Sequence, residues 1–250
     1  MMNQYETIKK KKNKFIFVIS FSFLLTLSVA LFLIFQPFFN KDIGYSIFLV
    51  LLLGYVFFLI YFRSKVVEVM MKYDYFRMLD EDLGLIQTGA TLYTKNWLKD
   101  LEENFEKHYE DSEIIFYYKF HKKLPKLGRT GRVLVYVIVS KEEDYDFHSN
   151  TINKHVEEVY NNYPHEKRVR KQIGIHFKKY QSFNEKHKEE LQEIINFKNG
   201  DILLMNIPVG YFVKEHKLYF LRPLKRFPHK YYYYTTNLIK ELSYIDGEEK

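Results

Sequence analysis

The chain has 250 residues, with 38 Lys or Arg against 31 Asp or Glu and a formal net charge of +7 at pH 7. It contains no cysteine, which excludes disulfide bonds, thiolate metal sites and a cysteine nucleophile. Residues 1–62 hold six basic and two acidic side chains, so the remainder carries only 32 basic against 29 acidic ones. A nucleic-acid-binding domain is usually more basic than this, and we do not expect nucleic acid as a partner.

Two uncharged apolar runs dominate the N-terminal quarter of the chain. They cover residues 15–36 and 43–62, and each matches the roughly 20 helical residues needed to cross a bilayer core about 30 Å thick. Backbone groups in hydrocarbon must be paired internally, so residues 15–62 are predicted to form a transmembrane helical hairpin. A cleaved signal peptide is the alternative, but the first run is long and no small-residue cleavage pattern follows it.

Basic residues flank these two runs asymmetrically. Five lysines lie in residues 1–14, which form a basic N-terminus, and Arg63 and Lys65 follow the second run. The connecting loop holds only Lys41 beside Asp42. The positive-inside rule therefore predicts a two-pass protein of the cell membrane with both termini in the cytoplasm and the lipid bilayer as its first partner.

The rest of the chain has the pattern of one cytoplasmic domain. We expect residues 63–90 to form a helical stalk and linker, 91–246 to form a mixed-sheet α+β domain, and 247–250 to be frayed. Helices are predicted over 94–109, 149–163, 183–197 and 230–245. Strands are predicted over 113–121, 132–139, 172–180, 201–207, 211–213 and 217–221. The 132–139 segment is apolar almost throughout, which indicates a central strand covered on both faces.

Within that domain the helix boundaries rest on capping signals. Thr94 is the expected N-cap of the first helix, whose apolar stripe extends to Tyr109. Ser182 and Glu185 have the spacing of a capping box and are expected to open the third helix.

Familiar catalytic motifs are absent from the sequence: it has no phosphate-binding Gly-rich loop, no G-x-S-x-G and no H-E-x-x-H. The candidates we name for catalysis or for a divalent cation are Asp144, Asp146, His148 and His155, because imidazole and carboxylate are competent ligands. Acids in a loop before a helix are more often solvated caps, so we expect neither a metal nor a cofactor. His176 is expected to be half-exposed on a strand, and His187 and Glu190 to belong to an ordinary polar helix surface.

Two basic clusters are candidate contact sites. The first consists of Lys167, Arg168, Arg170 and Lys171. The second, in a loop rich in aromatic residues, consists of Arg222, Lys225, Arg226, Phe227, Lys230 and Tyr231. Cations beside aromatic rings suit single-stranded nucleic acid or a membrane surface, and a domain tethered to an anionic leaflet meets lipid headgroups first. The plain alternative is a solvated basic face. Residues 100–113 are acidic and form a candidate surface for a basic protein partner.

These features together predict a membrane-anchored protein whose cytoplasmic α+β domain serves interaction, sensing or scaffolding, without catalysis. One alternative is a membrane-tethered hydrolase or metal-dependent enzyme, and another is an accessory subunit of a membrane complex. An enzyme predicts a pocket of convergent acids and histidines, whereas a binding module predicts a patch of tyrosines and basic side chains. The sequence does not set the oligomeric state.

Overall fold

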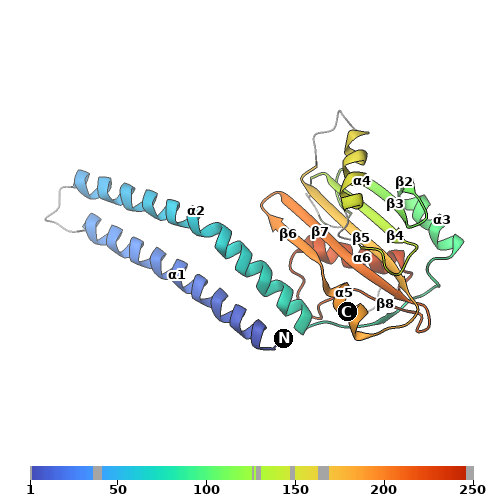
Figure 1. Ribbon diagram of the computed structural model, residues 1–250. Helices are drawn as coiled ribbons and strands as arrows, with labels where there is room; N and C mark the ends of the chain where they lie inside the picture. The colour runs from blue at the N-terminus through green and yellow to red at the C-terminus, as the bar shows by residue number, and fades with distance from the viewer. Residues whose placement is uncertain are drawn as a thin grey trace. The chain divides into compact units, whose positions relative to one another are not determined.

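The chain divides into two compact units, Met1–Arg77 and Met78–Lys250. The computed structural model describes residues 2–35, 41–125, 127, 131–146, 150–162 and 169–245 (Figure 1). The last residues of α2 belong to the second unit, which also contains the whole sheet.

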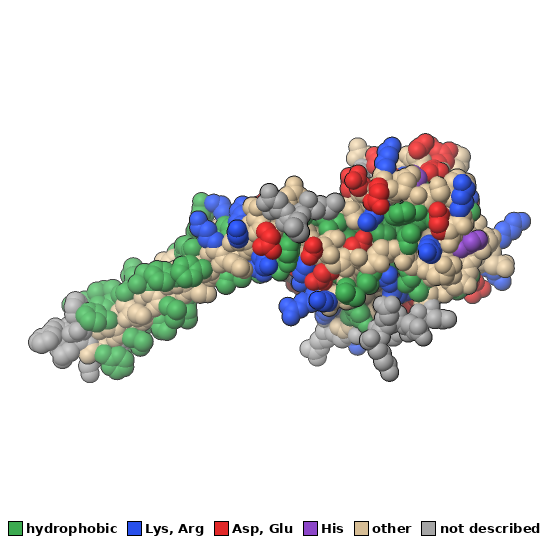
Figure 2. Space-filling view, turned by 90° about the horizontal axis from the view of Figure 1, so that it is seen from below, with side chains coloured by type: hydrophobic (Ala, Val, Ile, Leu, Met, Phe, Trp, Pro, Cys, Tyr) green, Lys and Arg blue, Asp and Glu red, His purple; other side chains and the backbone are tan. Residues whose placement is uncertain are grey.

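The first unit is a pair of long helices, α1 (Met2–Phe35) and most of α2 (Lys41–Asp80). Both are long and apolar enough to cross a membrane. Rings from the two helices pair along their length, with centroids 5.8 Å apart for Tyr5 and Tyr73 and 5.9 Å apart for Phe23 and Tyr55. Early residues of α1 thus meet late residues of α2, as in an antiparallel hairpin. Figure 2 shows hydrophobic side chains on the outer surface of this helix pair.

The second unit is built on a mixed sheet, which confirms the predicted α+β class. In the described residues its strands run in the order β1-β8-β7-β5-β4-β3-β2, and β6 pairs with β7 beside this path. The strands are β1 (Ile86–Gln87), β2 (Glu106–Glu110), β3 (Ile114–His121), β4 (Val133–Ser140), β5 (Lys171–Tyr180), β6 (Ile195–Asn199), β7 (Ile202–Phe212) and β8 (Lys217–Tyr219). The central strands β4, β5 and β7 are parallel, and the other pairings are antiparallel.

Helices cover both faces of this sheet (Figure 1). They are α3 (Lys95–Asn104), α4 (Asn150–Asn161), α5 (Glu185–Gln192) and α6 (Lys230–Leu242). On one face α4 packs its apolar side against Phe116 and Tyr136, and on the other the Trp97 ring of α3 lies 5.3 Å from Phe177. The Trp97 indole donates a hydrogen bond of 2.8 Å to the carbonyl of Leu242, which ties α3 to α6. Every β4 residue is buried, so the prediction of a central, doubly covered strand is confirmed.

The predicted helix over 94–109 is wrong in its second half. Thr94 is the N-cap as expected, with its hydroxyl accepting from the Trp97 N–H at 3.3 Å, but α3 ends at Asn104. The next residues form β2, which pairs antiparallel with β3 at the end of the sheet. The periodic apolar residues continue through Tyr109, but the free edge of β3 offers backbone partners that override this local pattern.

The predicted helix over 183–197 is also two elements. Its N-cap is Asn184, whose side-chain oxygen accepts from the His187 N–H at 2.8 Å, in place of the expected Ser182. The helix stops at Gln192, and the following apolar residues pair with β7 as strand β6. β7 is continuous through Pro208, where two strands were expected. Pro208 lies between the β7 segments that pair with β6 and β8, an interruption at which proline is compatible with a strand.

Candidate functional site

A β-bulge in β2 turns two consecutive side chains toward α4. Lys107 pairs with Tyr117 and Tyr109 pairs with Phe116, which leaves His108 as the extra residue of the bulge. Successive side chains of a regular strand point to opposite faces, and a bulge re-aims one of them. The His108 ring lies 5.8 Å from Phe116, and the Tyr109 ring stacks on His155 of α4 with centroids 4.1 Å apart.

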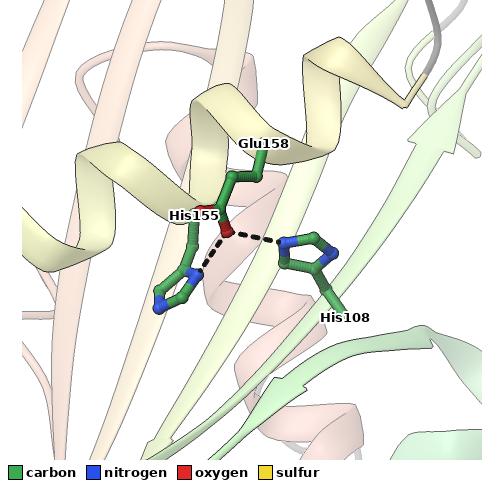
Figure 3. A group of neighbouring side chains, drawn as sticks. All are labelled: His108, His155 and Glu158. Atoms are coloured by element: carbon green, nitrogen blue, oxygen red, sulfur yellow. Dashed lines mark hydrogen bonds and ion pairs between the residues drawn. The ribbon is translucent and has the colours of Figure 1, made fainter.

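α4 contributes the other two members of this site, His155 and Glu158. Residues three apart on a helix share one face, so both side chains reach toward β2. The Oε2 atom of Glu158 lies 2.9 Å from His155 Nδ1 and 3.4 Å from His108 Nε2 (Figure 3). The side chain of His155 is 6% exposed and that of Glu158 is 40% exposed. The hydrogen bond with His155 lowers the pKa of the Glu158 carboxyl, which favours the carboxylate.

We call His108, His155 and Glu158 the bulge cluster. One ligand atom from each lies within 4.8 Å of the other two, and no other such group of three occurs among the described residues. Two imidazoles and a carboxylate are a ligand set that zinc sites use. The bulge cluster could therefore hold a divalent cation. Sequence reasoning missed His108 because its segment was expected to be helical, whereas the spacing of His155 and Glu158 is visible in the sequence.

A second polar site lies where the carboxyl ends of β4 and β5 meet α5. It is a pocket of about 240 Å³, lined by Glu143, Asp144, Tyr145, Asp146, Lys178, Tyr180, Lys186, His187 and Glu190. Lys178 is only 3% exposed, and its ammonium donates to the Tyr145 carbonyl at 3.0 Å and to Glu190 Oε1 at 2.5 Å. Burial raises the pKa of the Tyr180 hydroxyl, so this phenol stays neutral at physiological pH.

The four residues predicted to act together do not all lie in one place. Asp144 and Asp146 line the Lys178 pocket, whereas His155 belongs to the bulge cluster. His148 lies outside the described residues. His176 is 2% exposed, so the expectation of a half-exposed strand histidine is wrong. His187 and Glu190 line the Lys178 pocket instead of forming a plain polar surface.

A third hollow, of about 350 Å³, lies between α3 and α6 on the opposite face of the sheet. Its lining includes Trp97, Phe105, Lys119, His121 and Tyr234. Burial lowers the pKa of His121, and Lys119 lowers it further, so the imidazole facing this groove is neutral at pH 7. The groove combines aromatic walls with polar groups, as small-molecule sites often do. It contains none of the candidate catalytic or basic residues, although Asp100 and Glu103 of the acidic stretch line it.

The second basic cluster is only partly available for contact. Arg222 is 6% exposed and Tyr231 is 4% exposed, so both are buried. Arg222 precedes the exposed part of the loop, and Tyr231 packs within α6. Lys225, Arg226 and Lys230 are exposed and Phe227 is half-buried. Leu224, an apolar residue that follows Arg222 in the same loop, is 58% exposed and forms an apolar tip.

Hydrogen bonds hold this loop to the segment that follows α2. The Leu224 N–H donates to the carbonyl of Glu81 at 2.9 Å, and the Leu83 N–H donates to the carbonyl of Arg222 at 3.0 Å. We call residues 224–227 the basic loop. Of the first basic cluster, Lys167 and Arg168 lie outside the described residues, Arg170 is exposed, and Lys171 is half-buried with its ammonium 3.9 Å from Asp201.

Nearby lysine side chains offset part of the negative charge of the acidic stretch 100–113. Lys107 lies 3.1 Å from Glu102 and 2.9 Å from Glu110, and Lys141 lies 2.9 Å from Glu110. Both carboxylates raise the pKa of Lys107, which is therefore fully charged. The stretch consists of the end of α3, β2 and the turn after it, so a partner would meet a charged sheet edge in place of a helix.

Comparison of the chain with protein-family models, with curated proteins and with solved structures found no match.

Proposed function

We propose that this chain is a two-pass membrane protein whose α+β domain serves interaction or sensing at the inner face of the membrane, without catalysis. In this proposal α1 and α2 cross the bilayer as a hairpin, both ends of the chain are cytoplasmic, and the basic loop contacts anionic lipid headgroups. The observation that carries the proposal is the apolar surface of the two helices.

This surface is far more exposed than that of a helix packed in a soluble core. Only 6% of the apolar window of each helix is buried, whereas a helix in a soluble core buries at least one face. Exposed large hydrophobic side chains run from Ile16 to Phe35 and from Ile43 to Tyr61. Soluble monomers rarely expose contiguous apolar patches larger than a few hundred Å², and hydrocarbon would remove this surface from water. The lysines before the first apolar run and the basic residues after the second run support the inward orientation of both ends.

The basic loop has the composition of a lipid-contacting segment. Exposed Leu224 stands beside Lys225 and Arg226, so an apolar tip and two cations share one surface. Each Lys or Arg near an anionic leaflet gains about 1 kcal/mol. The hydrogen bond from its Leu224 N–H to the Glu81 carbonyl ties the loop to the chain directly after α2. Contact with headgroups would hold the domain in a defined orientation on the membrane.

Cysteine labelling tests the topology, because the native chain has no cysteine to interfere. Single Asn3→Cys, Asn40→Cys and Glu248→Cys variants of the full chain would be treated with a membrane-impermeant maleimide in intact and in permeabilised cells. We expect Asn40→Cys to react in intact cells and the other two only after permeabilisation. Release of the chain from membranes by alkaline carbonate, or reaction of all three variants in intact cells, would reject the proposal.

Fluorescence tests the lipid contact of the basic loop. The full-length Leu224→Cys variant, labelled with an environment-sensitive dye, would be placed in nanodiscs of neutral or anionic lipid. We expect a blue shift in anionic lipid that Lys225→Glu with Arg226→Glu removes. A Glu189→Cys label on the exposed side of α5 is the matched control. Equal emission of the Leu224→Cys label in both lipids would exclude the contact but leave the membrane anchor intact.

A hydrolase remains the second candidate, and the Lys178 pocket is the observation that favours it. Its carboxylates, its buried ammonium and His187 converge at the carboxyl ends of parallel strands, where ligands of α/β sheets commonly bind. Screening the full chain against generic esterase and phosphatase substrates tests it. Turnover lost in Asp144→Asn would support the enzyme, whereas equal turnover by both proteins would point to a contaminant.

A further inference from the structure

We infer that His108, His155 and Glu158 form a binding site for a first-row divalent cation, of which Zn²⁺ fits best, with one coordination position left for water. This inference rests on the second unit alone and is independent of whether the two helices cross a membrane. It departs from the sequence-based expectation that no metal is bound.

Two of the three separations between the donor atoms are near the spacing that zinc requires. In a tetrahedral site with bonds of 2.0–2.2 Å, two ligand atoms lie about 3.3 Å apart. Glu158 Oε2 lies 3.4 Å from His108 Nε2 and 2.9 Å from His155 Nδ1, so the second of these distances has to open by about 0.4 Å. The two imidazole nitrogens lie within 4.8 Å of each other, and binding brings them to the same spacing of about 3.3 Å. Both nitrogens point at the same carboxylate oxygen (Figure 3).

The surroundings fix both rings in place. His155 is stacked under Tyr109, and the His108 ring lies edge-on to Phe116 and Tyr118, with centroids 5.8 and 6.0 Å away. Rings locked by packing lose little freedom when they bind a metal, which favours affinity. Glu158, in contrast, is 40% exposed, so the open position of the cation faces solvent.

The plain alternative is a structural ion pair between His155 and Glu158 with His108 nearby. It explains the helix spacing of His155 and Glu158 but gives no reason for the bulge that turns His108 toward the same oxygen. Bulges are enriched next to functional sites, where they re-aim a side chain. A ligand set of two histidines and one glutamate with an open position is also that of known catalytic zinc sites.

Titration of the untagged full chain in detergent with Zn²⁺, followed by calorimetry, tests the inference. A polyhistidine tag must be avoided because it binds the same metals. We expect one equivalent per chain, and Co²⁺ should give the visible absorption of a tetrahedral site. Both His108→Asn and Glu158→Gln should weaken Zn²⁺ binding by at least about tenfold. These two side chains are less buried than that of His155, so we expect both variants to keep the fold. The fluorescence emission of Trp97 reports whether they do.

Two controls match these changes. Glu157→Gln removes an adjacent exposed carboxylate from the same helix, and His187→Ala removes a histidine of the Lys178 pocket. Both should bind Zn²⁺ like the parent chain. Binding that His108→Asn and Glu158→Gln leave unchanged, binding abolished only by His187→Ala, or no saturable binding below about millimolar Zn²⁺ would each overturn the inference.

Discussion

His229 should make the stability of the domain depend on pH. Its side chain is the N-cap of α6, where Nδ1 accepts from the Tyr232 N–H at 3.1 Å, and Nε2 lies 2.7 Å from the side-chain oxygen of Asn196 on β6. The ring therefore accepts at one nitrogen and donates at the other, which only the neutral imidazole can do. Burial and the nearby charge of Lys198 lower the pKa of His229 to about 4.

The sign and size of the effect follow from linkage. Histidine in the unfolded chain has a pKa of about 6.5. Between about pH 6.5 and 4 the unfolded state is therefore protonated at this residue to a greater extent than the folded state. Stability contributed by the neutral ring is complete above this range and is lost as the pH falls through it. With a folded pKa of about 4, the loss reaches about 2 kcal/mol at pH 5.

Urea unfolding of the full chain at about pH 7.5 and about pH 5 measures this loss. The chain has one tryptophan, Trp97, which is 1% exposed and bonded to the end of α6, so its emission reports the unfolding of this unit. His229→Asn keeps a good N-cap side chain but cannot take up the proton. We expect the variant to lose about 2 kcal/mol less than the parent between the two pH values. If both proteins lose the same stability, the assignment of a neutral, buried His229 is wrong.

Two further predictions concern the core of the sheet. Glu190→Gln removes the carboxylate that pairs with Lys178, which is 3% exposed, and should reduce the free energy of unfolding by about 2 kcal/mol. The control Glu189→Gln, on the exposed side of α5, should change the free energy of unfolding by less than about 0.5 kcal/mol. Equal effects of the two variants would show that the Lys178–Glu190 pair does not contribute to stability. Gly174→Ala would place a Cβ 2.5 Å from the Asn206 side-chain oxygen and 2.6 Å from the Tyr136 ring. We expect this crowding to reduce the free energy of unfolding by about 1–3 kcal/mol, measured by thermal or urea unfolding. An unchanged unfolding curve would show that the two side chains move aside freely.

Much of the sheet follows from local sequence. The β3–β4 hairpin was predictable because β-branched and aromatic residues fill both strands, and β4 reads as central because it is apolar almost throughout. α4 and α6 have an apolar face of helical period, and Thr94 is an N-cap in both sequence and structure. These elements carry their own signal.

The rest depends on partners distant in the chain. β2 and β6 have apolar residues that fit a helix equally well, and they become strands because β3 and β7 offer them free edges. The bulge cluster shares this origin. Its His155 and Glu158 are three residues apart on one helix, but His108 joins them only through a strand and a bulge that local pattern does not reveal. Likewise, the sequence alone suggests that Lys178 is a surface cation, whereas in the structure its ammonium is bound by the Tyr145 carbonyl and Glu190.

The bulge in β2 also affects the tendency of this chain to associate with other copies through strand pairing. β2 lies at one end of the sheet, where unpaired backbone N–H and C=O groups would otherwise invite a strand from another molecule. The extra residue breaks the regular row of these groups, and exposed Glu106, Lys107 and Glu110 place charges along it. At the opposite end β1 is only two residues long. Intermolecular strand addition is therefore discouraged at both ends of the sheet, which leaves concentrated protein less prone to aggregation by edge pairing.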